Sequence, residues 1–461
     1  MKALRDPQQL LADGLADIRA QFDVPGGFAP EVLAAAEEAA KREPAAHADW
    51  TDRAFVTLDP ADSTDLDQAF SIEAAGADML LHYAIADVGW FVRDGDALDA
   101  EAWERGTTTY LPDGKASLYP PMLSEKAASL LPDGERPAVV LTVRVDPAGE
   151  VRLDAATRAV IRSRAKLAYA KVSEGDLPQG FASLTTRLAE AEARRGAARV
   201  DPGEQQLEPD GNGGFALSFR PYSQAEEQNA ALSLAANMAV ARAMLEAETG
   251  LFRVMAAPDA EAIAELRLTA AAFALDWPAE MPLFQFEKRL DPARPADAAF
   301  MLAIRRAGRG ASYKPFEPGV LPWHSAIAAP YAHCTAPLRR LADRYVLQAV
   351  LALSDGAAVP APVLAAFEKL PRVMARAGSR DGQIDRAVID LAEAAILSNR
   401  EGEQFEAVVT DLRNDRAKIQ LCELPVVASV AANGTIPGER LQVRLESANP
   451  RQRAISFAIA G

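Results

Sequence analysis

Apolar positions recur with different periods along this chain of 461 residues, and the changes of period divide it into three parts. The first part shows helical spacing over residues 7–22 and again over residues 31–42, with turn-forming residues 23–30 between them. We predict a small helical domain over residues 1–50. Both a helix-turn-helix-like unit and a helical hairpin packed on the next domain fit this pattern.

The second part, residues 51–402, starts with strand patterns and continues with helical ones, which predicts an α+β domain. Apolar and β-branched runs predict strands over residues 79–85 and 139–145. A hairpin is predicted around residues 206–219, with its turn at residues 210–214. Stretches with a period near 3.6 predict helices over residues 181–199, 223–249, 257–275, 338–353, 360–370 and 380–400.

The third part, residues 403–461, changes to short alternating runs, which predict strands. Five short strands in such a span fit an OB-fold β-barrel, and an unrelated small barrel is the alternative. The predicted strands are residues 405–410, 417–421, 426–430, 440–445 and 454–458.

Four aspartates lie within nine residues near the start of the second part, at Asp59, Asp62, Asp65 and Asp67. They follow one apolar run and lead into another, over residues 66–72, that includes Asp67 and predicts a strand. In a strand, Asp65 and Asp67 would share one face because side chains alternate. Grouped carboxylates repel one another unless a cation lies among them, and carboxylate oxygens are ligands that Mg²⁺ prefers.

An ordinary explanation also exists for this segment, because Asp-rich loops commonly form turns with Asx hydrogen bonds. A calcium loop of the EF-hand type does not fit. Counted from Asp59, the sixth position is Thr64 where that loop needs Gly, and the twelfth is Phe70 where it needs Glu. The choice between a turn and a magnesium site depends on the motifs further along the chain.

Several such motifs occur in a fixed order over roughly residues 51–400. Together with the aspartates, they resemble the catalytic domain of the RNase II and RNase R family of exoribonucleases, the RNB domain. One of these pieces alone would be weak, whereas the ordered set is specific. The motifs are Leu81-His-Tyr-Ala-Ile-Ala-Asp-Val88, Arg105-Gly-Thr-Thr-Thr-Tyr-Leu-Pro112, Leu123-Ser-Glu125 and Tyr331-Ala-His-Cys-Thr-Ala-Pro-Leu-Arg-Arg340.

The resemblance implies a hydrolytic 3′-to-5′ exoribonuclease that degrades single-stranded RNA to nucleoside 5′-monophosphates. It implies Mg²⁺ in a two-ion site, with Mn²⁺ as a possible substitute. The metal ligands would be Asp59, Asp65, Asp67 and Gln68, with Asp65 and Asp67 also catalytic. Gln68 departs from the family motif, which has a fourth aspartate here, and its amide oxygen brings no charge. Asp62 is a local candidate to replace that charge.

The resemblance also implies residues that contact RNA. Arg339 would bind the scissile phosphate, since a guanidinium offers two donors and stays charged. If both arginines lie on the predicted helix, Arg340 points about 100° away and takes a structural or RNA-backbone role. Tyr110 would stack on bases near the 3′ end, with a core tyrosine as the alternative. Arg162 and Tyr169 are further RNA-binding candidates, and a late acidic residue is sought at Asp381 or Asp385.

Family members usually carry OB-fold domains ahead of the catalytic domain, but residues 1–50 are too few for a five-stranded barrel and their pattern is helical. The C-terminal strands resemble the RNA-binding domain that follows the catalytic domain in this family. A small-molecule phosphate ester hydrolase is disfavoured, since a small substrate needs no such domain. A catalytically weakened RNA-binding protein that retains the RNB fold is the second hypothesis, and Gln68 motivates it.

Charge and composition limit these hypotheses only moderately. The net charge of −16 opposes binding to RNA phosphates, so we expect a narrow basic groove in place of a broad basic surface. Two distant cysteines, no long apolar run and no signal-peptide core favour a cytoplasmic protein without a membrane segment. We expect a monomer whose partner is single-stranded RNA.

Overall fold

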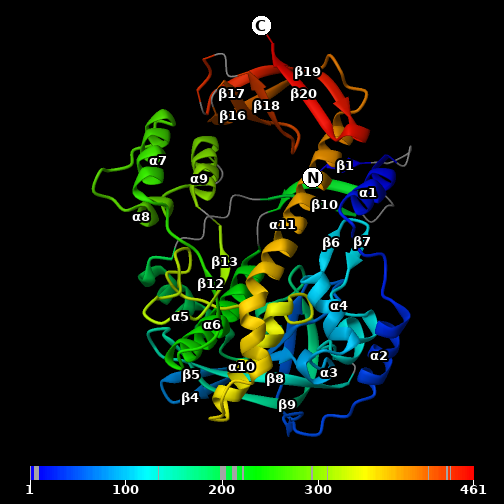
Figure 1. The fold of residues 1–461 in the computed structure, drawn as a ribbon. Coiled ribbons are helices and arrows are strands. Elements are labelled where there is room, and N and C mark those ends of the chain that lie inside the picture. The colour runs from blue at the N-terminus through cyan, green and yellow to red at the C-terminus, as the bar shows by residue number, and fades with distance from the viewer. Residues whose placement is uncertain are drawn as a thin grey trace.

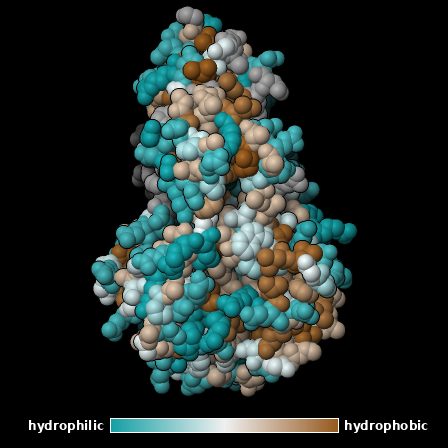
Figure 2. Space-filling model, turned by 90° about the vertical axis from the view of Figure 1, so that its left-hand side faces the viewer, coloured by the Kyte–Doolittle hydropathy of each residue, from teal (hydrophilic) through white to brown (hydrophobic). Residues whose placement is uncertain are grey.

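The computed structural model describes residues 2–4, 10–132, 134–197, 204–209, 215–220, 223–291, 294–308, 310–413, 415–431, 434–436 and 438–460. A large unit of mixed strands and helices is joined by the long helix α11 to a small β-barrel (Figure 1). The predicted α+β class is confirmed. On the face seen in space-filling view, hydrophilic and hydrophobic side chains are interspersed, and the broad lower unit narrows toward the barrel (Figure 2).

The large unit is built on a sheet that closes on itself. Strand β9 is long enough to serve two partners: its first part pairs antiparallel with β8, and residues 163–168 pair parallel with β3. The order β9-β3-β4-β5-β8-β9 therefore forms a ring, with β2 added beside β9. The strands are β2 (Ala48–Asp49), β3 (Phe55–Asp59), β4 (Gln68–Ala75), β5 (Asp78–Ala86), β8 (Glu135–Val145) and β9 (Val151–Ala168).

This ring determines where the first aspartate lies. In the parallel pairing, Asp59 at the end of β3 is opposite Ala168 at the end of β9. The backbone N–H of Tyr169 then donates to the carbonyl of Asp59 at 3.3 Å. The ends of two strands distant in sequence thus meet at one rim of the ring.

The prediction of a strand over residues 66–72 is wrong at its start, because β4 begins at Gln68. Asp65 and Asp67 lie in the preceding loop and do not share a strand face. The backbone there is held by a different segment: Leu66 N–H donates to Ser129 Oγ at 2.9 Å, and its carbonyl accepts from Leu130 N–H at 3.0 Å. These contacts come from residues that periodicity cannot connect to the loop.

Helices and short hairpins surround the ring. Helix α6 packs on β9 and begins with a capping box between Ser223 and Glu226, which satisfies two free N–H groups of its first turn. These elements are α2 (Pro30–Ala40), α3 (Val88–Phe91), α4 (Ala97–Arg105), β6 (Thr109–Leu111), β7 (Gly114–Ala116), η1 (Leu123–Ala127), η2 (Glu174–Asp176), α5 (Phe181–Arg195), α6 (Gln224–Glu246), β12 (Leu251–Val254), β13 (Ser312–Pro315), β14 (Trp323–His324), β15 (Ala329–Pro330) and α10 (Leu341–Ser354).

Helix α11 (Ala361–Leu397) is one continuous helix, so the prediction of two helices over 360–370 and 380–400 is wrong. Pro371 lies inside it, where proline removes a hydrogen bond and ordinarily kinks a helix. Tertiary packing overrides that cost because Leu370 and Met374, on either side of the proline, are both buried in the core of the ring. Leu370 is buried in the core of the ring, and Leu391 is buried in the core that the barrel shares.

The C-terminal barrel confirms all five predicted strands. Its order is β18-β17-β16-β19-β20, and β18 also contacts β20, which nearly closes the sheet as in an OB-type barrel. The strands are β16 (Gln404–Arg413), β17 (Arg416–Leu421), β18 (Val427–Ala431), β19 (Arg440–Asn449) and β20 (Ala454–Ile459), with η3 (Pro450–Gln452) between the last two.

The N-terminal segment is helical as predicted, but its two helices enter different cores. Helix α1 (Leu10–Gln21) buries Leu11, Leu15 and Ile18 against α11 and the barrel core. Helix α2 packs on α4 and buries Val32 in the ring core. This arrangement differs from both a helix-turn-helix unit and a helical hairpin. The division at residues 50 and 402 stays a prediction.

Two smaller groups of elements complete the fold. The predicted hairpin is formed by β10 (Glu204–Pro209) and β11 (Phe215–Arg220), with β1 (Lys2–Leu4) beside β11. Its predicted turn, residues 210–214, lies outside the described residues. On the other side of α11, α7 (Ala260–Ala272), α8 (Leu283–Glu287) and α9 (Pro295–Ala307) enclose an aromatic cluster in which Trp277 and Phe286 stack at 5.2 Å (Figure 1). In the part of the chain described here, no helix is long and apolar enough to span a membrane.

Glu393 connects α11 with the barrel and gives a pH prediction. One carboxylate oxygen, Oε1, accepts from Val427 N–H and from Gln205 Nε2, both at 2.7 Å. Burial raises the pKa of Glu393 from 4.5 to about 7, so the fold favours the neutral acid. A raised pKa means that this group stabilises the fold fully below its unfolded pKa, and the stabilisation is lost as the pH rises to the folded pKa.

We therefore expect wild type to lose stability relative to Glu393→Gln between pH 4.5 and about 7. The loss should be on the order of 3 kcal/mol, since the pKa rises by roughly two and a half units and each unit corresponds to roughly 1.4 kcal/mol. The amide retains an oxygen for both donors, which makes it the matched neutral form. Urea unfolding of both proteins at several pH values measures the difference, and parallel curves across this range would contradict the prediction.

Candidate functional site

Asp59 and Asp67 are the two carboxylates at the rim whose surroundings disfavour a negative charge. Burial raises the pKa of Asp59 to about 6, with Arg339 opposing the rise and Asp65 adding to it. Burial raises the pKa of Asp67 to about 7, again opposed by Arg339. These mutual effects place the three aspartates and the arginine within one electrostatic site.

Asp67 is held by a segment far away in sequence. Its Oδ1 accepts from the Leu338 N–H at 2.7 Å, and its Oδ2 lies 3.4 Å from Arg339 Nε. Its own carbonyl accepts from the Ala86 N–H at 2.9 Å at the end of β5. The side chain is only 7% exposed. The carboxylate therefore has a fixed position beneath an arginine.

Two residues outside the predicted set of site residues hold the loop that carries the aspartates. Lys166 on β9 donates to the carbonyls of Ala61 at 2.8 Å and Ser63 at 2.5 Å. Ser129 Oγ donates to the carbonyl of Thr64 at 2.7 Å. Lys166 lies two residues before the end of β9, next to the end of β3 that leads into this loop. The parallel pairing of these two strands would have indicated its position. Asp62 is exposed on this loop.

Asp65 faces the β6–β7 hairpin. Its Oδ1 pairs with Lys115 Nζ at 2.9 Å, and the same ammonium lies 3.0 Å from Glu125 Oε1. Its Oδ2 accepts from the Tyr110 hydroxyl at 3.4 Å. Glu125 belongs to η1, a π-helical turn of the kind often found near functional sites. Lys115 was not among the predicted site residues.

Gln68 is the first residue of β4, and its amide oxygen accepts the hydroxyl hydrogen of Tyr83. Tyr83 is fully buried. The position where the family motif has a fourth aspartate is thus occupied by a neutral side chain that already has a hydrogen-bond partner. This lowers the negative charge available at the rim.

Arg339 and Arg340 precede α10, so the prediction that separated them by helix geometry is wrong. A short bridge holds them: Thr108 N–H donates to the Arg339 carbonyl and Leu341 N–H to the Gly106 carbonyl, each at 3.0 Å. The Arg339 side chain is 45% exposed beside Asp67. It can therefore receive an anion from solvent.

Arg340 has a different environment. Its Nε and its terminal nitrogen donate to the carboxylate of Asp343 at 3.0 Å and 2.7 Å. Asp343 is fully buried and also accepts from the Ala336 N–H at 2.8 Å. The pair fixes the loop that leads to Arg339. The predicted RNA-binding role of Arg340 stays a prediction, and its guanidinium is engaged inside the protein.

The other predicted RNA-binding residues lie at different distances from the aspartates. Tyr110, on β6, is 49% exposed with its hydroxyl directed to Asp65. Tyr169 follows β9 next to Asp59, and its hydroxyl accepts from Asn229 Nδ2 at 2.8 Å. Arg162 lies six residues before the end of β9, roughly 20 Å from the rim, and pairs with Glu135. The structure does not bring Arg162 to the cluster.

Asp381 holds the approach to Tyr110. Its two carboxylate oxygens accept from Thr107 Oγ1 and Thr109 Oγ1, both at 2.8 Å. Of the two candidates for a late acidic residue, Asp381 thus fixes the hairpin base to α11. Both of these hydrogen bonds tie it to the hairpin segment.

The donor set fits a divalent cation in its chemistry. Among the described residues, no three acidic, histidine or cysteine side chains are grouped closely enough to hold an ion as they stand. Asp65 is turned to Lys115, and Asp67 to Leu338 and Arg339. However, burial raises the pKa values of Asp59 and Asp67, so the protein supplies less positive charge than these carboxylates need. A hard cation would supply that charge through oxygen ligands.

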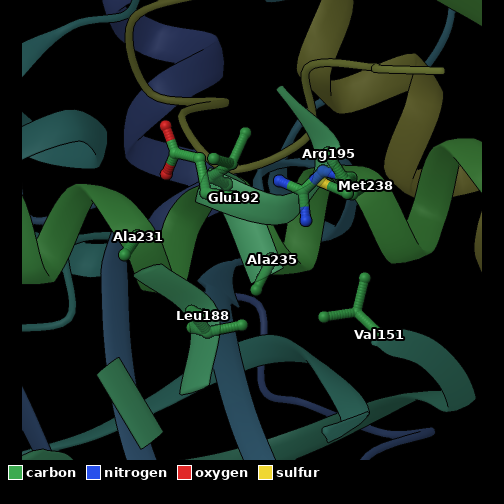
Figure 3. Close-up of a pocket in the computed structure, with 8 residues that line it drawn as sticks. Val151, Leu188, Glu192, Arg195, Ala231, Ala235 and Met238 are labelled. Atoms are coloured by element: carbon green, nitrogen blue, oxygen red, sulfur yellow. The ribbon is translucent and has the colours of Figure 1, made fainter. Parts of the chain in front are cut away.

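A small cavity lies elsewhere, between α5, α6 and the start of β9 (Figure 3). Leu188 and Arg195 line it from α5, Ala235 and Met238 from α6, and Val151 from β9. The space open to the centre of a water molecule is about 10 Å³, enough for about one water. It cannot admit a nucleotide, so we place no function there.

Comparison with known proteins gives the family. The RNB domain matches residues 47–355, and the C-terminal S1 domain of RNase II-type exonucleases matches residues 403–460. Ribonuclease R of Thermotoga maritima is 28% identical over 421 residues, which cover 84% of this chain and 59% of that protein. The chain thus spans about six-tenths of the length of this curated relative.

Solved structures show the same fold. Mycoplasma genitalium RNase R in complex with ribose-methylated single-stranded RNA matches with a TM-score of 0.86 at 18% identity, covering 100% of this chain and 79% of that one. Yeast Ssd1, a pseudonuclease, matches with a TM-score of 0.73 at 15% identity, covering 96% of this chain and 59% of that one. By its fold and its two matched domains, this chain belongs to the RNB family of RNase II- and RNase R-type proteins.

Proposed function

We propose that this protein is a 3′-to-5′ exoribonuclease that hydrolyses single-stranded RNA to nucleoside 5′-monophosphates with the help of divalent metal ions. One observation carries the proposal: the buried carboxylate of Asp67 lies directly beneath the half-exposed guanidinium of Arg339. A phosphate bound by that arginine would be held against the carboxylates at the rim. Membership of the RNB family supports the same reaction.

Each side chain has a distinct task in this proposal. Arg339 binds the scissile phosphate through charge-assisted hydrogen bonds. Asp59, Asp65 and Asp67 would hold metal ions, which supply an activated water and charge neutralisation at the phosphate. For Asp65 to do so, Lys115 must release one oxygen of that carboxylate. We infer Mg²⁺, with Mn²⁺ able to replace it.

Tyr110 grips the RNA near its 3′ end. An aromatic face stacks on any base, which contributes roughly 1–3 kcal/mol per base without reading the sequence. The exposed ring of Tyr110 stands beside Asp65, so a base stacked on it would lie next to the proposed cleavage site. This position makes it a candidate to decide how short an RNA can still be held.

Tyr110→Ala should therefore leave cleavage of long RNA largely intact and lengthen the final resistant fragment. Tyr110→Phe should behave nearly like wild type, because the aromatic face remains and only the hydroxyl is lost. Gel analysis of exhaustive digests measures the fragment lengths. An unchanged end product for folded Tyr110→Ala would indicate that the ring has only a packing role.

The reaction itself is tested with single-stranded RNA labelled at its 5′ end. In the presence of Mg²⁺, the labelled RNA should shorten stepwise and unlabelled nucleoside 5′-monophosphates should accumulate. Chelation should stop the reaction and Mn²⁺ should restore it. Early release of a labelled mononucleotide would contradict the proposed direction. A gel-filtration mass measurement checks the expected monomer.

A second function is favoured by Gln68. Its amide oxygen accepts a hydrogen bond from Tyr83, and the missing carboxylate lowers the affinity expected for a metal ion. The protein would then bind RNA without degrading it at an appreciable rate. RNA binding without shortening in the same assay supports this alternative. Hydrolysis of small phosphate esters without RNA binding would instead support a small-molecule hydrolase.

A further inference from the structure

We propose that Arg19 of helix α1 is a positioning residue for Tyr110, and that through it the N-terminal helix sets the length of the shortest RNA fragment. The inference rests on the proposed function for its product-length readout. It also makes a prediction about the motion of the β6–β7 hairpin, which does not depend on any catalytic activity.

The hairpin that carries Tyr110 is too small to hold its own position. Strands β6 and β7 have three residues each, and Tyr110 is paired with Lys115 across the hairpin. A two-stranded hairpin is marginally stable alone in water. Contacts from outside must therefore decide where the ring of Tyr110 stands relative to Asp65.

The base of the hairpin is fixed from two sides. Asp381 of α11 binds Thr107 and Thr109, which flank the start of β6. Lys115 of β7 binds Asp65 and Glu125. Both sets of contacts lie level with Tyr110 or nearer the open end of the hairpin, and neither reaches the turn that closes it.

Leu111, just before that turn, is buried in the core that α1 shares with α11, and Arg19 holds the turn itself. Its Nε lies 3.0 Å from Asp113 Oδ2, and a terminal nitrogen lies 2.8 Å from Asp113 Oδ1, so the pair is bidentate. The same nitrogen donates to the Gly114 carbonyl at 3.3 Å. Gly114 has a φ of 135°, which favours glycine and lets the turn present this carbonyl. In Figure 1 the hairpin lies directly below α1.

Helix α1 is packed tightly against its neighbours, so the backbone of Arg19 is held in place. Leu15 and Ile18 are fully buried in the core shared with α11. A Cβ atom added to Gly14 would lie 2.6 Å from the δ-carbons of Leu391, which shows how closely α1 approaches α11. The end of α1 also contacts the barrel through the hydrogen bond between Gln21 and Arg453. The arginine thus connects a fixed helix to a small hairpin.

The test uses Arg19→Ala and Asp113→Asn, each of which breaks the pair from one side. Arg242→Ala is the matched control, because it removes an exposed ion pair with Glu246 on α6. Loss of the Arg19–Asp113 ion pair should raise the rate of amide hydrogen exchange at residues 109–116 by about fivefold, as expected for losing one ion pair of this kind. The control should leave exchange there unchanged.

In exhaustive RNA digests, both variants should lengthen the final fragment in the same direction as Tyr110→Ala. Because Arg19 acts through Tyr110, Arg19→Ala should cause no additional lengthening in the Tyr110→Ala background. Combining Arg19→Asp with Asp113→Arg should restore much of the wild-type fragment length and exchange protection.

The outcomes separate the two proposals. If wild type does not degrade RNA, the proposed function fails, and hydrogen exchange alone decides whether Arg19 braces the hairpin. Unchanged amide hydrogen exchange at residues 109–116 in folded Arg19→Ala overturns the proposal that Arg19 holds the hairpin in position. Additive lengthening in the Tyr110→Ala background also overturns it, because Arg19 would then act on the RNA by another route.

Discussion

Asp67→Asn should abolish RNA hydrolysis while leaving RNA binding nearly intact. The substitution removes the charge with which Asp67 would hold a metal ion at the scissile phosphate. Loss of several kcal/mol of transition-state stabilisation corresponds to a decrease in turnover on the order of a thousandfold. The asparagine oxygen can still accept from the Leu338 N–H, which Asp67 now binds at 2.7 Å, so the fold should be retained.

Turnover and RNA affinity of the purified variant measure this effect. Asp62→Asn is the matched control, because Asp62 is an exposed aspartate of the same loop and should tolerate the same change. Residual turnover of Asp67→Asn within about tenfold of wild type, where tenfold is only 1.4 kcal/mol, would rule out the proposed role. Equal losses in both variants would point to a general effect of charge in the loop.

Arg339→Ala should lower turnover by roughly a hundredfold to a thousandfold, the usual effect of removing one aligned donor from a developing negative charge. Its side chain is 45% exposed, so its loss should change stability little. Arg340→Ala should differ in kind. It leaves the buried Asp343 without its bidentate partner, which costs on the order of 3–5 kcal/mol of folding free energy.

Kinetics and urea unfolding, measured on both variants, distinguish the two arginines. We expect Arg339→Ala to show a low kcat with a normal unfolding midpoint. For Arg340→Ala we expect a lowered midpoint, and a smaller kinetic effect in the molecules that remain folded. A stable Arg340→Ala protein with the lower kcat would reverse the assignment. Mild kinetic effects in both variants would contradict the proposal that one of these arginines binds the scissile phosphate.

Much of the fold could be predicted from sequence because neighbouring residues determine it. The five barrel strands have a period of two that a half-buried strand requires, and each is found where the pattern predicts it. Helices α5 and α6 likewise follow their apolar spacing. The ordered motifs led to the RNB family, which the matched domain over residues 47–355 confirms.

The wrong predictions share one cause, which is contact between distant segments. Helix α11 continues through Pro371 because side chains on both sides of it, Leu370 and Met374, are buried in the ring core, and no local rule contains that information. The strand β4 begins late because Ser129 and Leu130 bind the backbone of Leu66. In both cases tertiary packing overrides a local preference.

The sequence alone thus determined most of the elements, the family and the types of residue that would carry the chemistry. The tertiary structure alone decided what each of those residues faces. Asp67 meets Leu338 across 271 positions of the chain, and the two adjacent arginines are separated into an exposed one and an engaged one. The reason is physical: periodicity records which side of an element is apolar, whereas the partner of a polar side chain depends on how the ring, α10 and the hairpin pack together.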